Sequence, residues 1–552
     1  MKAFIKDKKS IVVTVIYGII WAGLLLLSLV FLVKHAYFQT LGCLLWEAVF
    51  TFFYFIRKGS FLHNILAYSE DKKANRRTDI AMAVTALLLI LGTVLPMGAA
   101  PAYNGEFPEH RNQYELTARA FAEGHLNIAY DDIDPMLEEM NNPYDPGERA
   151  ETGVEFYRDH AYYKGKYYMY FGVTPVILLF LPYHLITGGD LTTYHATQIF
   201  SAISIIAIFL LMRQLAKRFF PKMSALLLIC LCTAFSFIST YFAIGTPALY
   251  CTATSSAVCM EALSLLFLTR SIFITDPEKR GKQVFLAGLG TLFGAMAFGC
   301  KPTAALGNLV AIPLCVIFVK DRLSLNTKNK IIKIVADIAL IAIPYIVIGI
   351  LLMCYNYARF ESPFEFGQAY QLTGADQHNY GNFFETFSTV RTVNGILNNF
   401  IGFTPIIGTF PYVYYNSAFV NFPLLLFVFG VFSKTVSTGA GRAKMKAFMG
   451  TLFALPLIIT VMQIAWAPGD GTAERYRMDV YVFMVLLAFL VIGFFNETLS
   501  QPDMKRINSV ICFFCLIAVL MGVLFLLFPD DYNYTQWFPE SLENWRKVFM
   551  LH

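Results

Sequence analysis

The sequence predicts an all-α, polytopic membrane protein with about 13 transmembrane helices, two long extracytoplasmic loops and no separate soluble domain. The chain has 552 residues, of which 57% are hydrophobic and only 15% are charged. Its apolar residues form repeated runs of about 17–25, the length that crosses a hydrocarbon core about 30 Å thick. Two segments, 101–187 and 355–416, are the longest stretches between these runs.

Basic residues predict the orientation of the spans. Lysines precede the first apolar run, and basic clusters at 57–58, 72–77 and 213–222 follow later runs. The positive-inside rule places these clusters and the N-terminus in the cytoplasm. No small-residue cleavage site follows the first run, so we expect it to remain as an anchor. The predicted spans are 11–33, 36–56, 80–100, 194–212, 223–243, 248–270, 284–299, 303–319, 333–354, 417–433, 447–466, 480–496 and 508–528, which puts the C-terminus on the extracytoplasmic side.

The segment 171–187 is apolar but short, and it contains Pro175 and Pro182. A full crossing at this point would put the basic cluster 213–222 outside, against the charge rule. We therefore predict a re-entrant or interface-lying element on the extracytoplasmic side, which is tolerated where irregular backbone packs against protein.

The spans divide the chain into four parts in a cytoplasmic membrane. The first is a two-helix hairpin with its cytoplasmic loop, 1–78. A core follows at 79–354, and it carries the first outer loop, 101–187. The second outer loop is 355–416, and 417–552 holds the last transmembrane helices and an outer tail.

Charge and cysteine usage exclude several classes of function. The net charge is +5, and the cationic residues flank apolar spans instead of forming one basic stripe, so no nucleic-acid partner is expected. All ten cysteines lie in or beside apolar segments, which argues against a disulfide framework or a cysteine zinc site. The histidines of the polar loops lack metal-ligand spacing. The sequence predicts no cofactor and leaves a metal open.

The segment 101–170 is an acidic, aromatic-rich stretch. It carries 14 Asp or Glu against 6 Lys or Arg. A carboxylate held beside aromatic side chains at a membrane interface can deprotonate an acceptor hydroxyl as general base. Glu106 and Glu109 directly follow the third span, and Asp145 and Asp159 lie further along the loop. These four are the candidate catalytic residues, and the alternative for each is a solvated loop charge.

Lys301 is a single cation between two apolar spans, in Cys300-Lys301-Pro302. An ionised lysine near membrane depth costs about 2.5–3.5 kcal/mol on insertion scales, so its presence indicates a function by default. A lipid phosphate would satisfy it. The alternative is a lysine whose long side chain reaches the lipid headgroups.

A second cationic group precedes the span 480–496. Arg475, Tyr476 and Arg477 lie at an outer interface, against the charge bias, which favours phosphate binding through the guanidinium fork. The alternative is that both arginines pair with Glu474 and Asp479.

From the third span onward, the chain resembles the GT-C class of polytopic glycosyltransferases, which includes the protein O-mannosyltransferases and the lipid A aminoarabinose transferase. In that class a core of seven spans carries a long first outer loop, and another long loop follows the seventh span. More narrowly, three motifs resemble an uncharacterised bacterial subfamily: NPYDP at 142–146, DHAYYKGKYY at 159–168, and YFG at 170–172 with a proline at 175.

The resemblance implies an inverting transfer of a sugar from a polyprenyl-phosphate donor to a glycan, lipid or protein acceptor on the extracytoplasmic face. The class places a catalytic Asp or Glu early in the first outer loop, which matches Glu106 or Glu109 best. The usual Asp-Glu pair before an aromatic residue is absent, so Asp145 and Asp159 stay open as alternatives.

The same resemblance implies a donor-phosphate site. A basic residue after the fifth core span matches Lys301, and an Arg-Tyr pair before a late span matches Arg475 and Tyr476. Arg477 next to that pair, and His160 and Tyr168 within the resembling motif, complete the candidate substrate contacts.

Two other functions remain open from the sequence. A transporter or flippase of lipid-linked glycans predicts paired halves or broken helices with charges at the midplane. The polar residues instead crowd one face of the predicted bundle, which favours an enzyme. A GT-C-like scaffold without catalysis is the third possibility, because the acidic motif is atypical.

Overall fold

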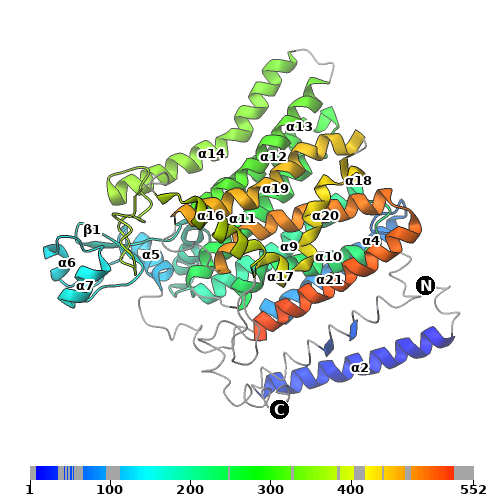
Figure 1. Ribbon diagram of the computed structural model, residues 1–552, viewed down its shortest axis with the longest axis horizontal. Helices are drawn as coiled ribbons and strands as arrows, with labels where there is room; N and C mark the ends of the chain where they lie inside the picture. The colour runs from blue at the N-terminus through cyan, green and yellow to red at the C-terminus, as the bar shows by residue number, and fades with distance from the viewer. Residues whose placement is uncertain are drawn as a thin grey trace.

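The computed structural model describes residues 8–34, 66–94, 112–245, 249–324, 329–381, 386–402, 417–437, 440–466 and 474–527, together with residues 43, 46, 47, 50, 51 and 54. This part of the chain is a bundle of long helices with a small lobe at one end (Figure 1). Ten of its helices are long and apolar enough to cross a membrane. The protein is therefore an all-α polytopic membrane protein, as the sequence predicts.

The long helices follow the predicted spans closely. They are α2 (Lys8–Val33), α4 (Lys72–Leu89), α9 (Thr193–Phe219), α10 (Ala225–Gly245), α11 (Leu249–Ile272), α12 (Arg280–Cys300), α13 (Ala311–Leu323), α14 (Lys330–Phe360), α19 (Ala440–Trp466), α20 (Met478–Thr498) and α21 (Gln501–Leu527). A 3-10 helix, η8 (Pro302–Val310), leads into α13 and completes that span. Shorter connecting elements are η2 (Ile90–Val94), η7 (Pro277–Lys279), α16 (Thr389–Phe400), α18 (Lys434–Ser437) and η10 (Glu474–Arg477).

Three predicted spans are not among the ten. The segment 36–56 lies mostly outside the described residues, and 80–100 is described only as far as Val94. The segment 417–433 forms α17 (Ala418–Asn421) and then η9 (Pro423–Phe432), a 3-10 helix of 10 residues. At about 2 Å of rise per residue, a 3-10 helix of that length spans only about 20 Å. This segment therefore differs from the regular transmembrane helix that its hydrophobicity predicts.

The segment 171–187 is short and irregular. It forms a π-helical turn, η6 (Val176–Phe180), which continues directly into α8 (Leu181–Thr187). Pro175 lies in the first turn of this helix, where its missing N–H costs no helical hydrogen bond, whereas Pro182 lies where η6 continues into α8 and leaves a carbonyl of the preceding turn without its helical donor. A helix of five plus seven residues is too short to cross a bilayer. Its length is compatible with the predicted interface-lying element.

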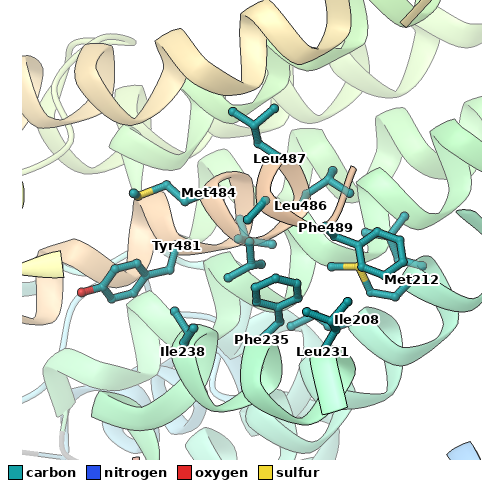
Figure 2. Close-up of a cluster of buried hydrophobic side chains, with 14 of the residues drawn as sticks. Ile208, Met212, Leu231, Phe235, Ile238, Tyr481, Met484, Leu486, Leu487 and Phe489 are labelled. Carbon is teal, nitrogen blue, oxygen red and sulfur yellow. The ribbon is translucent and has the colours of Figure 1, made fainter. Parts of the chain in front are cut away.

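Helix α20 is the central helix of the bundle. Its residues from Met478 to Phe494 are buried on every side, as expected for a helix that is apolar all round. Figure 2 shows Tyr481, Met484 and Phe489 of α20 packed beside Phe235 and Ile238 of α10. The N-terminus of α20 is therefore held rigidly by the core, and this end of the helix carries the site described below.

The lobe comprises residues 112–170 and 361–381. Its secondary structure is α5 (Gln113–Ala122), α6 (Met136–Glu139), α7 (Pro146–Thr152) and a hairpin of β1 (His160–Tyr163) and β2 (Lys166–Met169). Lys164 and Gly165 form the two-residue turn of the hairpin, both with positive φ (47° and 74°). This conformation matches the twist of paired strands, and glycine adopts it without strain.

The two predicted outer loops pair with each other inside the lobe. The Leu372 N–H donates to the His160 carbonyl (2.9 Å), and the Asp159 N–H donates to the Leu372 carbonyl (2.7 Å). The Tyr162 N–H donates to the Tyr370 carbonyl (2.9 Å), and Ala161 and Gln371 form an isolated antiparallel bridge between the second loop and β1. Residues 159–162 are therefore fixed from both sides by backbone hydrogen bonds.

Glu115 ties α5 of the lobe to the transmembrane bundle. Its Oε1 accepts a 2.7 Å hydrogen bond from the Thr193 N–H at the start of α9, and the residue is only 7% exposed. Burial raises the pKa of the Glu115 carboxyl from 4.5 to about 8. The folded protein therefore binds a proton on the Glu115 carboxyl more tightly than the unfolded chain does.

This shift predicts a stability that depends on pH. The contribution of Glu115 is fully present below about pH 4.5 and is lost as the pH rises through about 8. We expect Glu115→Gln to flatten this dependence and to stabilise the protein by about 1–3 kcal/mol above pH 8, since one pKa unit is about 1.4 kcal/mol. Thermal unfolding of both proteins in detergent, between about pH 4.5 and pH 8 and above, measures this stability difference. Glu123→Gln, at the exposed end of the same helix, is the control, and equal pH profiles for wild type and Glu115→Gln would contradict the prediction.

Gly172 lies where the chain from β2 passes the last turn of α12. A Cβ atom at this position would collide with the backbone carbonyl oxygens of Gly299 and Cys300, which cannot move independently of α12. A Cβ atom on Gly349, in α14, would meet no atom within 4 Å. The two glycines therefore provide a matched pair of substitutions.

We expect Gly172→Ala to destabilise the protein by about 1–3 kcal/mol, the usual cost of overpacking. Gly349→Ala should be neutral or stabilising by up to about 1 kcal/mol, because alanine favours a helix interior. The melting temperatures of the two variants in the same detergent compare them directly. An unchanged melting temperature for Gly172→Ala would show that the chain does not pass this close to α12.

Candidate functional site

Lys301 lies at the break between α12 and η8. The residue before a proline avoids the helical region, and Lys301 has an extended backbone (φ −156°, ψ 125°) before Pro302. Proline opens η8 at no hydrogen-bonding cost because its nitrogen needs no partner there. The sequence Lys-Pro therefore ends one helix, starts the next and leaves the lysine side chain at the junction.

Asp479 is the ion-pair partner of Lys301. The Lys301 Nζ lies 2.5 Å from Asp479 Oδ2, and the two side chains are 16% and 0% exposed. Thr303 donates to the same oxygen (3.2 Å), and the Gln463 amide of α19 does so at 2.7 Å. Asp479 is in the first turn of α20, where the helix dipole stabilises a negative charge. The pair thus joins α12, η8, α19 and α20 at one point.

Aromatic rings connect this ion pair to Arg475. The Lys301 Nζ lies 4.5 Å from the centre of the Tyr476 ring, and the Arg475 guanidinium lies 5.1 Å from the same ring. Arg475 also lies over the ring of Tyr250, at 4.6 Å, at the start of α11. Both cations are within the range of favourable cation–π contact. Among the side chains that the structure describes, Arg475 forms no ion pair, so its charge faces rings.

Asp159 stands at the other side of Tyr250. The Tyr250 hydroxyl donates to Asp159 Oδ2, and the Gln371 amide donates to Oδ1 at 3.3 Å. Asp159 has a positive φ of 60°, which aspartate tolerates better than most residues. Its backbone is held by the pairing of the two loops, and the Gln113 amide donates to its carbonyl (3.0 Å). The carboxylate is therefore fixed in place, buried and supplied with two donors.

Tyr170 follows β2 and faces the same cluster. Burial raises the pKa of its hydroxyl above the usual range. Tyr476, Asp159 and Tyr250 raise it further, whereas Arg475 lowers it, which identifies these four as its electrostatic neighbours. Two residues of the lobe and five residues at helix ends thus meet in one place. We call this group the polar cluster: Asp159, Tyr170, Tyr250, Lys301, Arg475, Tyr476 and Asp479.

The four carboxylates predicted as catalytic are placed differently. Glu106 and Glu109 lie outside the described residues. Asp145 caps α7, since its Oδ1 accepts a 2.8 Å hydrogen bond from the Gly147 N–H. Asp159 alone of the described candidates belongs to the polar cluster.

The remaining predicted contacts divide in the same way. Lys301, Arg475 and Tyr476 belong to the polar cluster, whereas Arg477 is buried and its Nε donates to Asn399 of α16 (3.2 Å). Among the described ion pairs, the cation beside Asp479 is Lys301 and not an arginine. The side chain of Glu474, the other partner in that alternative, lies outside the described residues.

His160 and Tyr168 lie in the interior of the lobe. His160 is 0% exposed, and its ring nitrogens contact the Tyr130 hydroxyl (2.9 Å) and the Arg158 carbonyl (3.0 Å). Tyr168 packs against Phe360, with ring centres 5.3 Å apart. Both surroundings favour a structural role, and the nearby Tyr170 is the tyrosine that faces the polar cluster.

Sequence reasoning missed Tyr250, Gln371 and the buried acid Glu261. Tyrosine and glutamine carry no signal of their own in a long apolar or polar segment. Glu261 did have a signal, because it is the single acidic residue of the span 248–270 and an ionisable residue within a span indicates function.

Neither a metal-binding group nor a cavity indicates a second functional site in the described part of the chain. Within the described ranges, no group of three or more His, Cys, Asp or Glu is placed to hold a metal ion. A cavity of about 570 Å³ lies between α12 and α14, lined by apolar residues with Arg280 and Asp337 at its edge. Its lining on α12 ends at Leu292, about 13 Å along the helix from Lys301, and includes no residue of the polar cluster.

Comparison of the sequence with protein-family models and with curated proteins finds no match. Comparison of the fold with solved structures finds a similarity to the archaeal oligosaccharyltransferase AglB from Archaeoglobus fulgidus, in complex with an inhibitory peptide and a dolichol-phosphate. The sequence identity is 11% and the TM-score is 0.41. The similar region covers 87% of this chain and 60% of the archaeal chain, so this chain spans less than two thirds of that protein's length.

Proposed function

We propose that the protein is a GT-C-type membrane glycosyltransferase, which moves a sugar from a polyprenyl-phosphate donor to an acceptor hydroxyl on the extracytoplasmic face. The observation that carries the proposal is the polar cluster, in which the Asp159 carboxylate and two cations lie along a line of tyrosine rings. A glycosyl transfer needs these two functions side by side: a base for the acceptor and positive charge for the departing phosphate.

The cations support a phosphate site. Arg475 has the planar fork of donors that matches a phosphate, and the rings beside it leave its charge without a carboxylate among the described residues. The Lys301 side chain is 16% exposed and its ammonium has three N–H donors, so it can turn from Asp479 to an anion at the site. Tyr476 lies between the two cations and holds both at a fixed spacing.

Asp159 supports the role of general base. Its 3.3 Å contact with Gln371 is long, so Oδ1 can also accept a hydrogen bond from a substrate hydroxyl. The pairing of the two loops fixes the backbone that carries this carboxylate. Asp145, by comparison, is occupied as a helix cap.

In the proposed reaction, the acceptor oxygen forms a bond to the anomeric carbon while its proton passes to Asp159. The bond between that carbon and the phosphate oxygen breaks, and the electron pair leaves with the phosphate. Lys301 and Arg475 stabilise the charge that develops there. Attack from the side opposite the phosphate inverts the anomeric centre.

We expect Lys301→Ala and Arg475→Ala each to lower transfer by about 10²–10³-fold, the usual effect of removing one donor to a developing oxyanion. The assay uses protein in nanodiscs, radiolabelled polyprenyl-phosphate hexoses and an envelope extract as the source of acceptor. Lys282→Ala and Arg270→Ala, exposed at the other ends of α12 and α11, are the matched controls.

Full transfer by both Lys301→Ala and Arg475→Ala would contradict the phosphate site. Movement of the labelled lipid across the bilayer without any product would favour the transporter instead. If wild type shows neither transfer nor transport with any hexose donor, the scaffold becomes the better description.

Asp159→Asn should lower transfer by about 10²–10⁴-fold, the range of general-base catalysis, and leave donor binding intact. Asparagine keeps the shape and the acceptor oxygen for Tyr250 but cannot take the proton. Asp145→Asn should keep transfer, because asparagine caps a helix about as well as aspartate does. Loss of transfer in Asp145→Asn and not in Asp159→Asn would assign the base to Asp145.

A further inference from the structure

Glu261 is a buried acid next to the polar cluster. It lies in the middle of α11 and is 4% exposed. Neither of its carboxyl oxygens has a hydrogen-bond partner within the part of the chain that the structure describes. A Cβ atom added to Gly307 of η8 would lie 2.9 Å from Glu261 Oε1 and 2.7 Å from the Phe483 ring, so backbone and ring enclose this oxygen.

The charged and titratable groups that face Glu261 come from three elements. They are Asp479 of α20, Lys301 at the junction of α12 and η8, and Cys300 at the end of α12. Lys301 already balances the charge of Asp479. A second carboxylate with no hydrogen bond would therefore be an uncompensated buried anion, which is costly.

Asp479 has an unused acceptor of its own. Its Oδ2 receives Lys301, Thr303 and Gln463, whereas its buried Oδ1 has no partner among the described residues. Helices α11 and α20 pack directly against each other. The two carboxyl groups are not hydrogen-bonded to each other in this structure, so Asp479 Oδ1 is an acceptor that a protonated Glu261 reaches only when the side chains move.

We propose that Glu261 carries a proton and acts as the reserve partner of Asp479. By this we mean that the protonated Glu261 carboxyl donates a hydrogen bond to Asp479 when Lys301 turns to an anionic phosphate. The inference rests on the proposed function, because that function supplies the phosphate. The positive helix terminus favours the charge on Asp479, so the proton stays on Glu261 and is shared with Asp479 through the new hydrogen bond. No proton needs to enter or leave, and Lys301 keeps its charge. Glu261 is thus a positioning residue that lowers the cost of releasing Lys301.

Two variants separate this role from simple packing. Glu261→Gln keeps the shape and an N–H donor for Asp479, whereas Glu261→Met keeps the length and loses the donor. The probe is farnesyl phosphate, titrated into purified protein in nanodiscs, with farnesol as the control that lacks the phosphate. We expect Glu261→Gln to bind about as tightly as wild type, and Glu261→Met to bind about 10–100-fold more weakly, because the buried Asp479 then loses its cation and gains no replacement donor.

Equal weakening in both variants, or tight binding by Glu261→Met, would overturn the reserve-partner role. If Glu261→Met does not yield a folded protein, Glu261→Leu replaces it in the same comparison.

A second measurement needs no ligand. Infrared spectra of the unliganded protein should contain the carbonyl band of a protonated carboxylic acid that disappears in Glu261→Gln. A spectrum unchanged by the substitution would overturn the protonated state. Failure of wild type to bind farnesyl phosphate would instead refute the phosphate site and the exchange of partners with it, while the infrared band still tests the proton on Glu261. The two failures are therefore distinguishable.

Discussion

The buried ion pair between Lys301 and Asp479 is the contact on which the arrangement of the site depends. It joins the break between α12 and η8 to the first turn of α20, and α20 is the helix that the core surrounds on every side. Removing one partner of such a pair costs far more than the pair contributes, because the other charge is left without compensation. The pair is thus better understood as a device that fixes position and charge than as a source of stability. Its neighbours Thr303 and Gln463 support this, since both donate to the same carboxylate oxygen.

The lobe depends on a second constraint, the pairing of two segments separated by about two hundred residues. Backbone hydrogen bonds between 159–162 and 370–372 hold Asp159 in a left-handed conformation that the residue would not keep in a free loop. The Arg359 guanidinium, at the end of α14, donates to the Met169 carbonyl (2.9 Å) and so ties the hairpin to a transmembrane helix. Because Gly172 then passes directly against the end of α12, the lobe and Lys301 share one rigid junction. The carboxylate of the lobe and the cations of the bundle are positioned by the same framework.

The sequence predicted the helices well and named only some members of the polar cluster, for identifiable reasons. Length and hydrophobicity determine a transmembrane helix, so α9 to α14 and α19 to α21 follow the predicted spans, although α14 extends to Phe360 beyond the predicted 354.

Lys301 and Arg475 were recognisable because a cation at membrane depth is costly and therefore conspicuous. Tyr250 and Gln371 were not, since their role comes from which side chain each happens to face after folding. Asp479 was considered only as a partner of the nearby arginines, because sequence distance favoured them over a lysine 178 positions away. His160 and Tyr168 were chosen from their motif, and a motif does not reveal which of its side chains point inward.

Tyr250 explains how opposite charges can stay close without neutralising each other. Its hydroxyl donates to Asp159, and the face of its ring receives Arg475, so the carboxylate and the guanidinium are separated by one aromatic ring. Without that ring, a buried aspartate and a nearby arginine would form a bidentate pair, and neither would be available to a substrate. Tyr476 does the same between Arg475 and Lys301, where it attracts two like charges to one ring and offsets part of their repulsion. The aromatic residues of this site therefore act as spacers that keep the charges apart. This property, more than any single ionisable group, suits the polar cluster to the proposed reaction, which needs a base and a cation at once.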